Sequence, residues 1–291
     1  DENYEIYTEM EEDGRFKLKL FCVNPAGNLQ NCLDRGSSAV FFSATVLPLA
    51  YYRSLFSTAE DDYAICAASP FDPGKRLLLL ARDVSSRYTR RGYEEYRKIA
   101  EYIYQTAMAK KGNYMVFFPS YQYMQEIEGV LSARGSGLVR TLQKNNMNEA
   151  EREDFLRKFE EERTGSFAAF CVMGGVFSEG IDLKEERLIG AILIGTGLPM
   201  VCTEQEILKG YFDRQNKDGF RFAYQYPGMC KVMQAAGRVI RTAEDRGVVA
   251  LLDERFLEWD YQAMFPREWT DYQIVDRGNV KAAVERFWEG Q

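Results

Sequence analysis

The chain has 291 residues, of which 46% are hydrophobic and 28% charged, and its formal net charge is −7. This length allows one large domain or two small ones, and the acidic balance means that any contact with nucleic acid requires a local basic patch. The chain contains no histidine, which excludes histidine general bases, Ser-His-Asp triads and histidine metal ligands.

The six cysteines are scattered and form no Cys-x-x-Cys pair, so no zinc knuckle or iron–sulfur cluster is expected in this chain. No apolar run approaches the roughly 20 residues of a membrane-spanning helix, and no signal peptide is visible. We therefore expect a cytoplasmic protein without a membrane partner or a resident metal.

The first 56 residues predict a β-hairpin, a short helix and a buried strand. Apolar runs flank a turn at Gly14, and a short helix follows Pro25. The predicted elements are strands Tyr4–Met10 and Phe16–Val23, helix Ala26–Asp34 and strand Ala39–Phe42. Ser43-Ala44-Thr45 follows the last strand, and Thr45 could simply cap a helix that begins near Pro48.

A polar, turn-rich segment, Ser57–Pro73, predicts a linker before the strand Leu77–Ala81. The next ten residues hold the best local basic patch, with four arginines against one acid and an aromatic residue, Tyr88, between Arg87 and Arg90. Arginine beside an aromatic side chain suits a nucleic-acid backbone with a stacked base. An ordinary charged surface loop is an equally good interpretation.

From residue 93 onward, helical patterns alternate with short, continuously apolar strands. The predicted helices are Tyr93–Lys111, Tyr121–Ala133, Asn148–Glu162, Thr203–Asn216 and Met229–Arg241. The predicted strands are Tyr114–Phe118, Leu138–Leu142, Phe167–Met173, Leu188–Ile194 and Val248–Leu252. This alternation predicts an α/β fold with a parallel sheet covered on both faces and ligands at the carboxyl ends of the strands. The aromatic-rich tail, Asp253–Gln291, is expected to pack back on this domain.

Two predicted strand ends carry residues suited to phosphate. Ser120 begins a helix whose free amides can hold a phosphate, although helix capping explains this serine equally well. In the segment 174–182, two glycines let the backbone approach a ligand closely. Ser178 can meet a nucleic-acid phosphate there, and Glu179 and Asp182 are acceptors for a ribose hydroxyl, water or an arginine. A plain tight turn is the alternative.

The segment Gln234–Arg241 predicts a charged stripe on a helix. Gln234, Arg238 and Arg241 stand at i, i+4 and i+7, which places them on one face. Two fixed cations and an amide suit a polyphosphate, whereas a solvated charged face is the alternative. Gly237 suggests the close approach of another backbone.

Taken in chain order, Ser43-Ala44-Thr45, Ser178–Asp182 and Gln234–Arg241 resemble motifs of a superfamily-two helicase of the XPD/DinG type. The resemblance runs from about Leu18 to Phe256; its last two motifs are specific and its first is weak. It implies a RecA-like fold with three parts. These are the end of a first motor domain (1–56), a linker (57–76) and a second motor domain (77–291).

The resemblance also implies roles for the motif residues. Arg238 and Arg241 would act as arginine fingers on ATP, and Gln234 would sense the nucleotide. Glu179, Gly180 and Asp182 would touch the nucleotide, and Ser43 and Thr45 would couple hydrolysis to movement. Asp253, in Asp253-Glu254-Arg255-Phe256, would brace Arg238 or Arg241 by ion pairing. Single-stranded DNA would meet Ser120 and Ser178. The same DNA is expected to contact Arg87, Tyr88 and Arg90, which are proposed from the chemistry of the basic patch and not from the resemblance.

No Gly-x-x-x-x-Gly-Lys-Ser/Thr loop is present, so Asp253-Glu254 is not interpreted as a magnesium-binding Walker B pair. ATP and Mg²⁺ would be bound jointly with the first motor domain, and this chain alone is expected to be inactive. The rival hypothesis is a non-catalytic α/β module that binds nucleic acid or protein through structural arginines. A Walker A loop encoded upstream would favour the enzyme.

Overall fold

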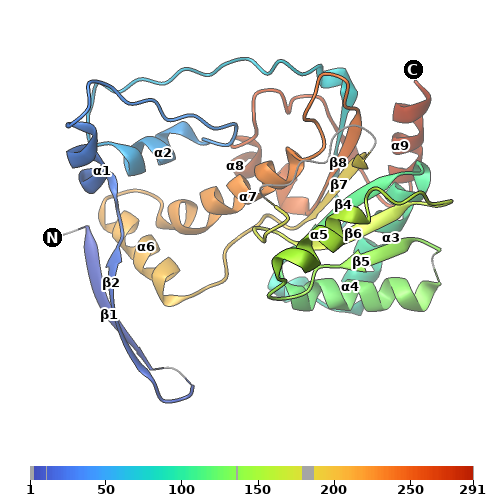
Figure 1. Ribbon diagram of the computed structural model, residues 1–291, viewed down its shortest axis with the longest axis horizontal. Helices are drawn as coiled ribbons and strands as arrows, with labels where there is room; N and C mark the ends of the chain where they lie inside the picture. Colours follow the sequence, from blue (N-terminus) through green and yellow to red (C-terminus); the bar gives the residue numbers. More distant parts are fainter. Residues whose placement is uncertain (1–2, 11, 136, 179–186, 291) are drawn as a thin grey trace. The chain divides into compact units, whose positions relative to one another are not determined.

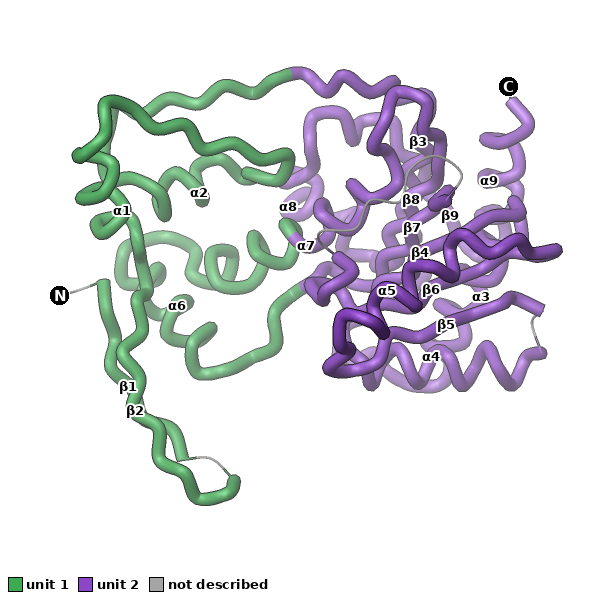
Figure 2. Tube along the Cα trace, viewed as in Figure 1, with its two compact units in different colours: residues 1–67, 198–230 green, residues 68–197, 231–291 purple. Residues whose placement is uncertain are grey.

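The computed structural model describes residues 3–10, 12–135, 137–178 and 187–290 (Figure 1). It divides into two compact units: unit 1 comprises residues 1–67 and 198–230, and unit 2 comprises residues 68–197 and 231–291 (Figure 2). Among the described residues, no helix has the length and apolar character needed to cross a membrane.

Unit 1 is built from an antiparallel hairpin and a set of helices. Its elements are β1 (Tyr4–Met10), β2 (Phe16–Cys22), α1 (Ala26–Leu33), α2 (Leu49–Phe56), α6 (Thr203–Arg214) and the π-helix η4 (Arg221–Gln225). A small core of Val23, Tyr211 and Phe212 holds them together. One face of the hairpin is tied to α6, because Glu204 accepts a hydrogen bond from Tyr7 and pairs with Lys19 at 2.8 Å.

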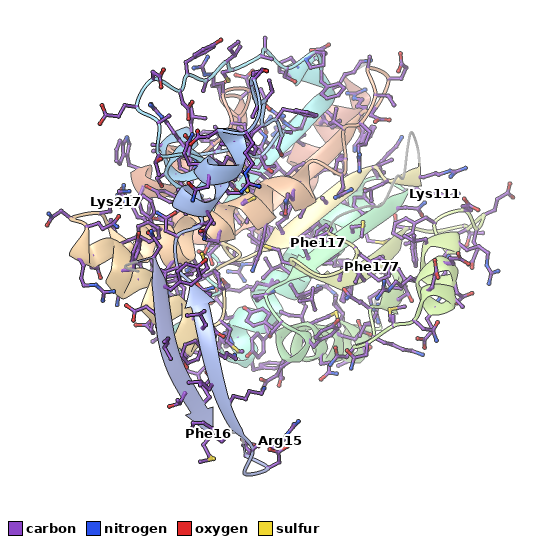
Figure 3. The ribbon with its side chains drawn as sticks, turned by 60° about the vertical axis from the view of Figure 1, so that its left-hand side comes forward. Arg15, Phe16, Lys111, Phe117, Phe177 and Lys217 are labelled. Atoms are coloured by element: carbon purple, nitrogen blue, oxygen red, sulfur yellow. The ribbon has the colours of Figure 1, made fainter. Side chains whose placement is uncertain are left out.

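The other face of the hairpin is apolar and exposed. The register pairs Ile6 with Leu20 and Met10 with Phe16, and Leu18 lies between them on the same face. These five side chains are between 63% and 71% exposed. Figure 3 shows Phe16 at the free end of the hairpin. The predicted hairpin is therefore confirmed, and it presents a continuous apolar surface.

The predicted buried strand at Ala39–Phe42 is wrong. This segment has no regular structure, and Val40 and Phe42 are 81% and 90% exposed. A strand needs a neighbour to satisfy its backbone, and no described strand pairs with this segment. The predicted cap is also wrong, because α2 follows Pro48 without a side-chain cap, and Thr45 instead donates its N–H to Ser43 Oγ at 3.2 Å.

Unit 2 is an α/β domain whose seven strands are all parallel, in the order β5-β6-β4-β7-β8-β3-β9. The strands are β3 (Arg76–Ala81), β4 (Asn113–Phe118), β5 (Val139–Leu142), β6 (Phe167–Val172), β7 (Gly190–Ile194), β8 (Gly247–Leu252) and β9 (Tyr272–Val275). The helices are α3 (Tyr93–Ala109), α4 (Tyr121–Arg134), α5 (Glu149–Arg157), α8 (Trp259–Gln262) and α9 (Val280–Glu289). The helix α7 (Tyr226–Ala236) begins in unit 1 and ends in unit 2.

Both faces of the sheet are buried, as the continuously apolar strands predict. Alternate residues such as Leu79, Val116 and Phe170 join the core that packs against α3, α4 and α9. On the opposite face, Phe117 is fully buried, and Phe159, just after α5, packs edge-on against Phe167. The sequence therefore predicts the fold class correctly: a parallel α/β sheet covered by helices on both sides.

The aromatic tail packs back on unit 2, as expected, and it also extends the sheet. β9 pairs in parallel with β3, and α9 packs against α3. At the same end, Tyr102 and Arg277 both bond to Asp83, and Arg277 Nε lies 2.8 Å from its carboxylate. The ninth strand was not predicted, since only its last residue, Val275, is buried.

Candidate functional site

The carboxyl edge of the sheet collects most of the predicted site residues of unit 2 that the structure describes. Ser120 follows β4, the Gly174–Ser178 loop follows β6, Asp253 follows β8, and the arginines of the basic patch follow β3. Parallel strands end at the same edge of a sheet, so residues distant in sequence are brought to one side of the domain. This is the region where an open α/β sheet binds ligands.

Ser120 caps α4. Its Oγ accepts the N–H of Tyr123 at 3.2 Å, and the helix closes on Gly135 in the left-handed conformation. The capping interpretation of Ser120 thus describes the observed contact. Ser120 remains half-buried beside the helix amides, and its contact with a phosphate stays a prediction.

The loop after β6 is a tight turn braced by its own serine. Gly174 has a φ of +74°, which favours glycine. Ser178 is fully buried, and its hydroxyl accepts the N–H of Gly174 at 2.9 Å and donates to the carbonyl of Val172 at 3.4 Å. Phe177 anchors the loop inside unit 2 (Figure 3) by stacking on Phe155. The predicted nucleotide residues Glu179, Gly180 and Asp182 lie outside the described residues.

The prediction that α7 continues to Arg241 is wrong. The helix ends at Ala236, and the chain leaves it through turns in which Arg238 and Val239 donate to the carbonyls of Ala235 and Ala236 at 3.3 Å. The single helical stripe therefore does not exist. Gly237 serves the end of the helix: a Cβ built there would meet only carbonyls of the preceding turn, not another segment's backbone.

The two arginines nevertheless project from one short segment beyond α7. Arg238 donates to the carbonyl of Ser178 through Nε at 3.1 Å and Nη2 at 2.7 Å. Arg241 has an exposed side chain, and its own N–H and that of Thr242 donate to Asp245 Oδ2 at 2.6 and 2.7 Å. The structure thus joins Arg238 to the Gly174–Ser178 loop and fixes the backbone that carries Arg241. Gln234 lies half-buried on the last turn of α7.

The predicted partner of Asp253 is wrong. Asp253 is fully buried and pairs with Arg255, whose Nε lies 2.8 Å from Oδ1. Its other oxygen accepts the N–H and the hydroxyl of Ser86 at 2.8 and 2.7 Å. Both oxygens are thus used inside one network, so Asp253 fastens the segment after β3 to the end of β8. Burial alone would raise the pKa of Asp253, but the bonds from Arg255 and Ser86 outweigh it and lower the pKa below its usual value.

Gly195 follows β7 with a φ of +80°, and a Cβ built there would collide with the hydroxyl of Ser86. We expect Gly195→Ala to lower the free energy of unfolding by about 2–4 kcal/mol, because it combines a left-handed alanine with overpacking. The matched control is Gly129→Ala, where a Cβ on the exposed side of α4 meets nothing. Denaturant unfolding measures both; equal stability of the two variants would contradict the argument.

The basic patch is balanced by acids. Arg87 pairs with Glu258 at 2.7 Å and approaches Glu254 at 3.8 Å, and Arg90 lies 3.9 Å from Glu254 and 3.8 Å from Glu95. All are exposed or half-buried except Glu95, which is 5% exposed. The patch is therefore a network of weak ion pairs between largely exposed side chains. A phosphate can take the place of a carboxylate as the partner of either arginine.

Tyr88 is the exposed aromatic of this patch. It is 82% exposed, and the guanidinium of Arg91 lies 5.2 Å from its ring centre and 5.0 Å from that of the buried Tyr123. The Arg91 guanidinium thus makes cation–π contacts with both rings, while most of the Tyr88 side chain stays open to solvent. The sequence singled out Tyr88 but not the role of Arg91 or Tyr123.

Ser43 and Thr45 lie in unit 1, where their hydroxyl oxygens are 3.3 Å apart. Within the described ranges, no three His, Cys, Asp or Glu side chains are grouped so that they could hold a metal ion. Two further residues of unit 2 escaped the sequence analysis: Ser86 and the buried Gln143. Arg255 belongs to the motif Asp253-Glu254-Arg255-Phe256, but its ion pair with Asp253 was not predicted.

Comparison with known proteins agrees with this arrangement. Residues 103–272 match the family model described as the helicase C-terminal domain. The chain is 26% identical over 236 residues to the ATP-dependent DNA helicase XPD of Sulfolobus acidocaldarius, covering 79% of this chain and 41% of that protein. It is also 26% identical over 259 residues to the XPD/RAD3 helicase subunit of the general transcription and DNA repair factor IIH of Saccharomyces cerevisiae, covering 82% and 32%.

Among solved structures, an XPD helicase matches with a TM-score of 0.68 at 18% identity, covering 94% of this chain and 48% of that one. This likeness supports the RecA-like fold. The chain spans less than half the length of these relatives. Since the family model covers more than half of the chain, the chain belongs to the helicase C-terminal domain family, the domain found in helicases of the XPD/RAD3 and DinG type.

Proposed function

We propose that the chain works as the second motor domain of an ATP-dependent DNA helicase, with residues 1–56 as the end of the first motor domain and 57–76 as the linker. The observation that carries this proposal is the pairing of Arg238 with the Ser178 carbonyl, next to an exposed Arg241 on a backbone fixed by Asp245. This arrangement links the arginine segment, which we propose to face the nucleotide, to the Gly174–Ser178 loop, which we propose to contact DNA.

The residues present suit ATP as a shared ligand. An exposed guanidinium on a fixed backbone can stabilise the charge that develops as a phosphoryl group leaves, which is the role of an arginine finger. When bound, ATP supplies that phosphoryl group, and a P-loop domain would supply the Mg²⁺ site. Arg241 would reach the triphosphate and Arg238 would set the loop behind it, while Gln234, Glu179, Gly180 and Asp182 are proposed to contact the nucleotide.

The proposed partner within the same protein is a P-loop motor domain. The apolar face of the hairpin and the exposed Val40 and Phe42 in unit 1 are surfaces that a folded neighbour would cover. Ser43 and Thr45 directly follow that exposed segment. Docking of the first motor domain there would place both hydroxyls at the junction where nucleotide hydrolysis is coupled to movement.

We propose that single-stranded DNA lies along the carboxyl edge of the unit 2 sheet. Ser120 at the start of α4 and the loop that ends at Ser178 would hold its phosphates. In the basic patch, Arg87 and Arg90 would exchange their carboxylates for phosphates, and the solvent-facing ring of Tyr88 would stack on a base.

Charge reversal of the patch tests the DNA path. Arg87→Glu and Arg90→Glu are expected to weaken single-strand binding and to flatten its salt dependence by about 0.7 in log K against log salt for each lost phosphate contact. Fluorescence anisotropy between low and moderate salt gives the slope. The control is Arg97→Glu, since Arg97 is an exposed arginine in a similar ion pair with Glu94. An unchanged slope in the patch variants would remove the patch from the proposal.

The whole proposal is tested by ATP hydrolysis of the full-length protein that carries this chain, with and without single-stranded DNA. DNA-stimulated hydrolysis that depends on Arg238 and Arg241 supports it. Absence of hydrolysis together with retained DNA or protein binding would favour the rival, a non-catalytic α/β binding module. The simplest discriminating observation is a Walker A loop encoded upstream in the same gene.

A further inference from the structure

Gln143 is a buried glutamine just past the end of β5. Only 5% of its surface is exposed. Its Oε1 accepts the N–H of Val172 at 2.9 Å, and its Nε2 donates to the hydroxyl of Tyr121 at 2.8 Å. Val172 ends β6 immediately before the Gly174–Ser178 loop, and Tyr121 opens α4 immediately after Ser120. One side-chain amide therefore joins two segments that are about fifty residues apart in sequence.

The same amide lies against the turn of the loop. A Cβ built on Gly175 would lie 3.1 Å from Gln143 Nε2 and 2.9 Å from the carbonyl oxygen of Val172. Gly175 donates its own N–H to that carbonyl at 3.0 Å and accepts the N–H of Ser178 at 2.8 Å. The Gln143 amide thus packs directly against the turn. This close approach depends on the absence of a side chain at residue 175.

We infer that Gln143 is a positioning residue that holds the amino end of α4 and the Gly174–Ser178 loop in one fixed relation. This inference rests on the proposed function, which assigns both segments to the same DNA strand. Gln143 is buried, so it would act without contacting the DNA itself. Buried amides with both ends satisfied are costly to break, so this bridge keeps the two phosphate-facing segments at a constant spacing.

The test uses the full-length protein and a labelled single-stranded oligonucleotide. Gln143→Ala removes the amide, and Gln143→Met keeps its length while removing both hydrogen-bonding groups. Each is expected to raise the Kd for the oligonucleotide about tenfold, as the loss of one or two buried hydrogen bonds implies. The DNA concentration for half-maximal ATP turnover should rise by a similar factor, while turnover at saturating DNA changes much less.

The matched control is Asn113→Ala. The Asn113 amide also makes two hydrogen bonds, both donated by Nδ2, to the carbonyls of Phe159 at 2.9 Å and Arg187 at 3.1 Å, but at the amino end of the sheet. It should lower stability without changing the Kd. Tyr121→Phe removes the acceptor of Nε2 together with the long hydrogen bond of the hydroxyl to the Lys144 carbonyl at 3.4 Å. It should raise the Kd in the same direction as Gln143→Ala, and it carries the test if Gln143→Ala fails to fold.

The outcomes separate the two proposals. If the wild-type protein binds the oligonucleotide and the folded Gln143 and Tyr121 variants bind it with the same Kd, the inference is overturned but the proposed function is not. An equal loss of binding in Asn113→Ala also overturns it, because the effect would then follow general stability. A wild-type protein that does not bind the oligonucleotide instead refutes the proposed function, and the inference falls with it.

Discussion

Arg241→Ala in the full-length protein is expected to lower ATP turnover by about a thousandfold, the effect of removing an arginine finger, with a far smaller change in the affinity for single-stranded DNA. The physical reason is that Arg241 is exposed on a backbone segment fixed by Asp245, so its loss removes charge stabilisation without loosening the fold. Steady-state ATP hydrolysis at saturating DNA measures the effect.

Arg238→Ala should lower turnover as well, but its side chain has a second duty. Its two hydrogen bonds to the Ser178 carbonyl hold the loop after β6, so this variant should also weaken DNA binding to a modest degree. Arg241→Lys separates charge from geometry, since lysine keeps the charge but lacks the planar fork. The control is Arg157→Ala, an exposed arginine of α5. Wild-type hydrolysis in both Arg238→Ala and Arg241→Ala would refute the assignment.

Asp253→Asn is expected to lower the free energy of unfolding by about 3–5 kcal/mol, because it leaves the buried guanidinium of Arg255 without its counter-charge. The network is compact: Asp253 is fully buried, and Arg255 also donates to Ser86 at 2.9 Å. Chemical denaturation at neutral pH measures the loss. Glu94→Gln, which breaks the exposed pair with Arg97, is the control and should change stability by less than about 1 kcal/mol.

The stabilisation by Asp253 should also depend on pH. Because folding lowers the pKa of this carboxyl, its contribution is fully present above the pKa of the unfolded chain, near 4, and is lost as the pH falls through the lower folded value. The difference in stability between wild type and Asp253→Asn should therefore shrink on acidification below about pH 4. A difference that stays constant from pH 7 to pH 3 would show that the ion pair does not stabilise the fold.

The central strands were predictable because they are apolar on both faces, which is a strong local signal. Leu77–Ala81 and Tyr114–Phe118, for example, differ from β3 and β4 by one residue at their starts. The segment Ala39–Phe42 shows the limit of that signal. It is apolar enough for a strand, but a strand also needs a neighbour to bond with, and local sequence does not reveal whether one exists.

The arginine segment shows a different limit. Val239 and Ile240 continue a helical apolar pattern beyond Ala236, so periodicity favours a longer helix than the one observed. Gly237 was the available stop signal, because glycine commonly follows a helix end. The sequence yields candidate site residues only where motifs mark them, and their functional roles stay predictions. Gln143 and Ser86 belong to no motif, and their contacts depend on which strands become neighbours.

The hairpin of unit 1 carries a practical consequence. Its two strands pair only with each other among the described residues, so each keeps one open edge beside a face of five exposed apolar side chains. An unpaired strand edge beside an exposed apolar face can pair with the same hairpin of another molecule. We therefore expect the chain, when produced by itself, to aggregate through this hairpin. Co-expression with a covering domain, or lysine substitutions on that face, would improve its solubility without touching the α/β unit.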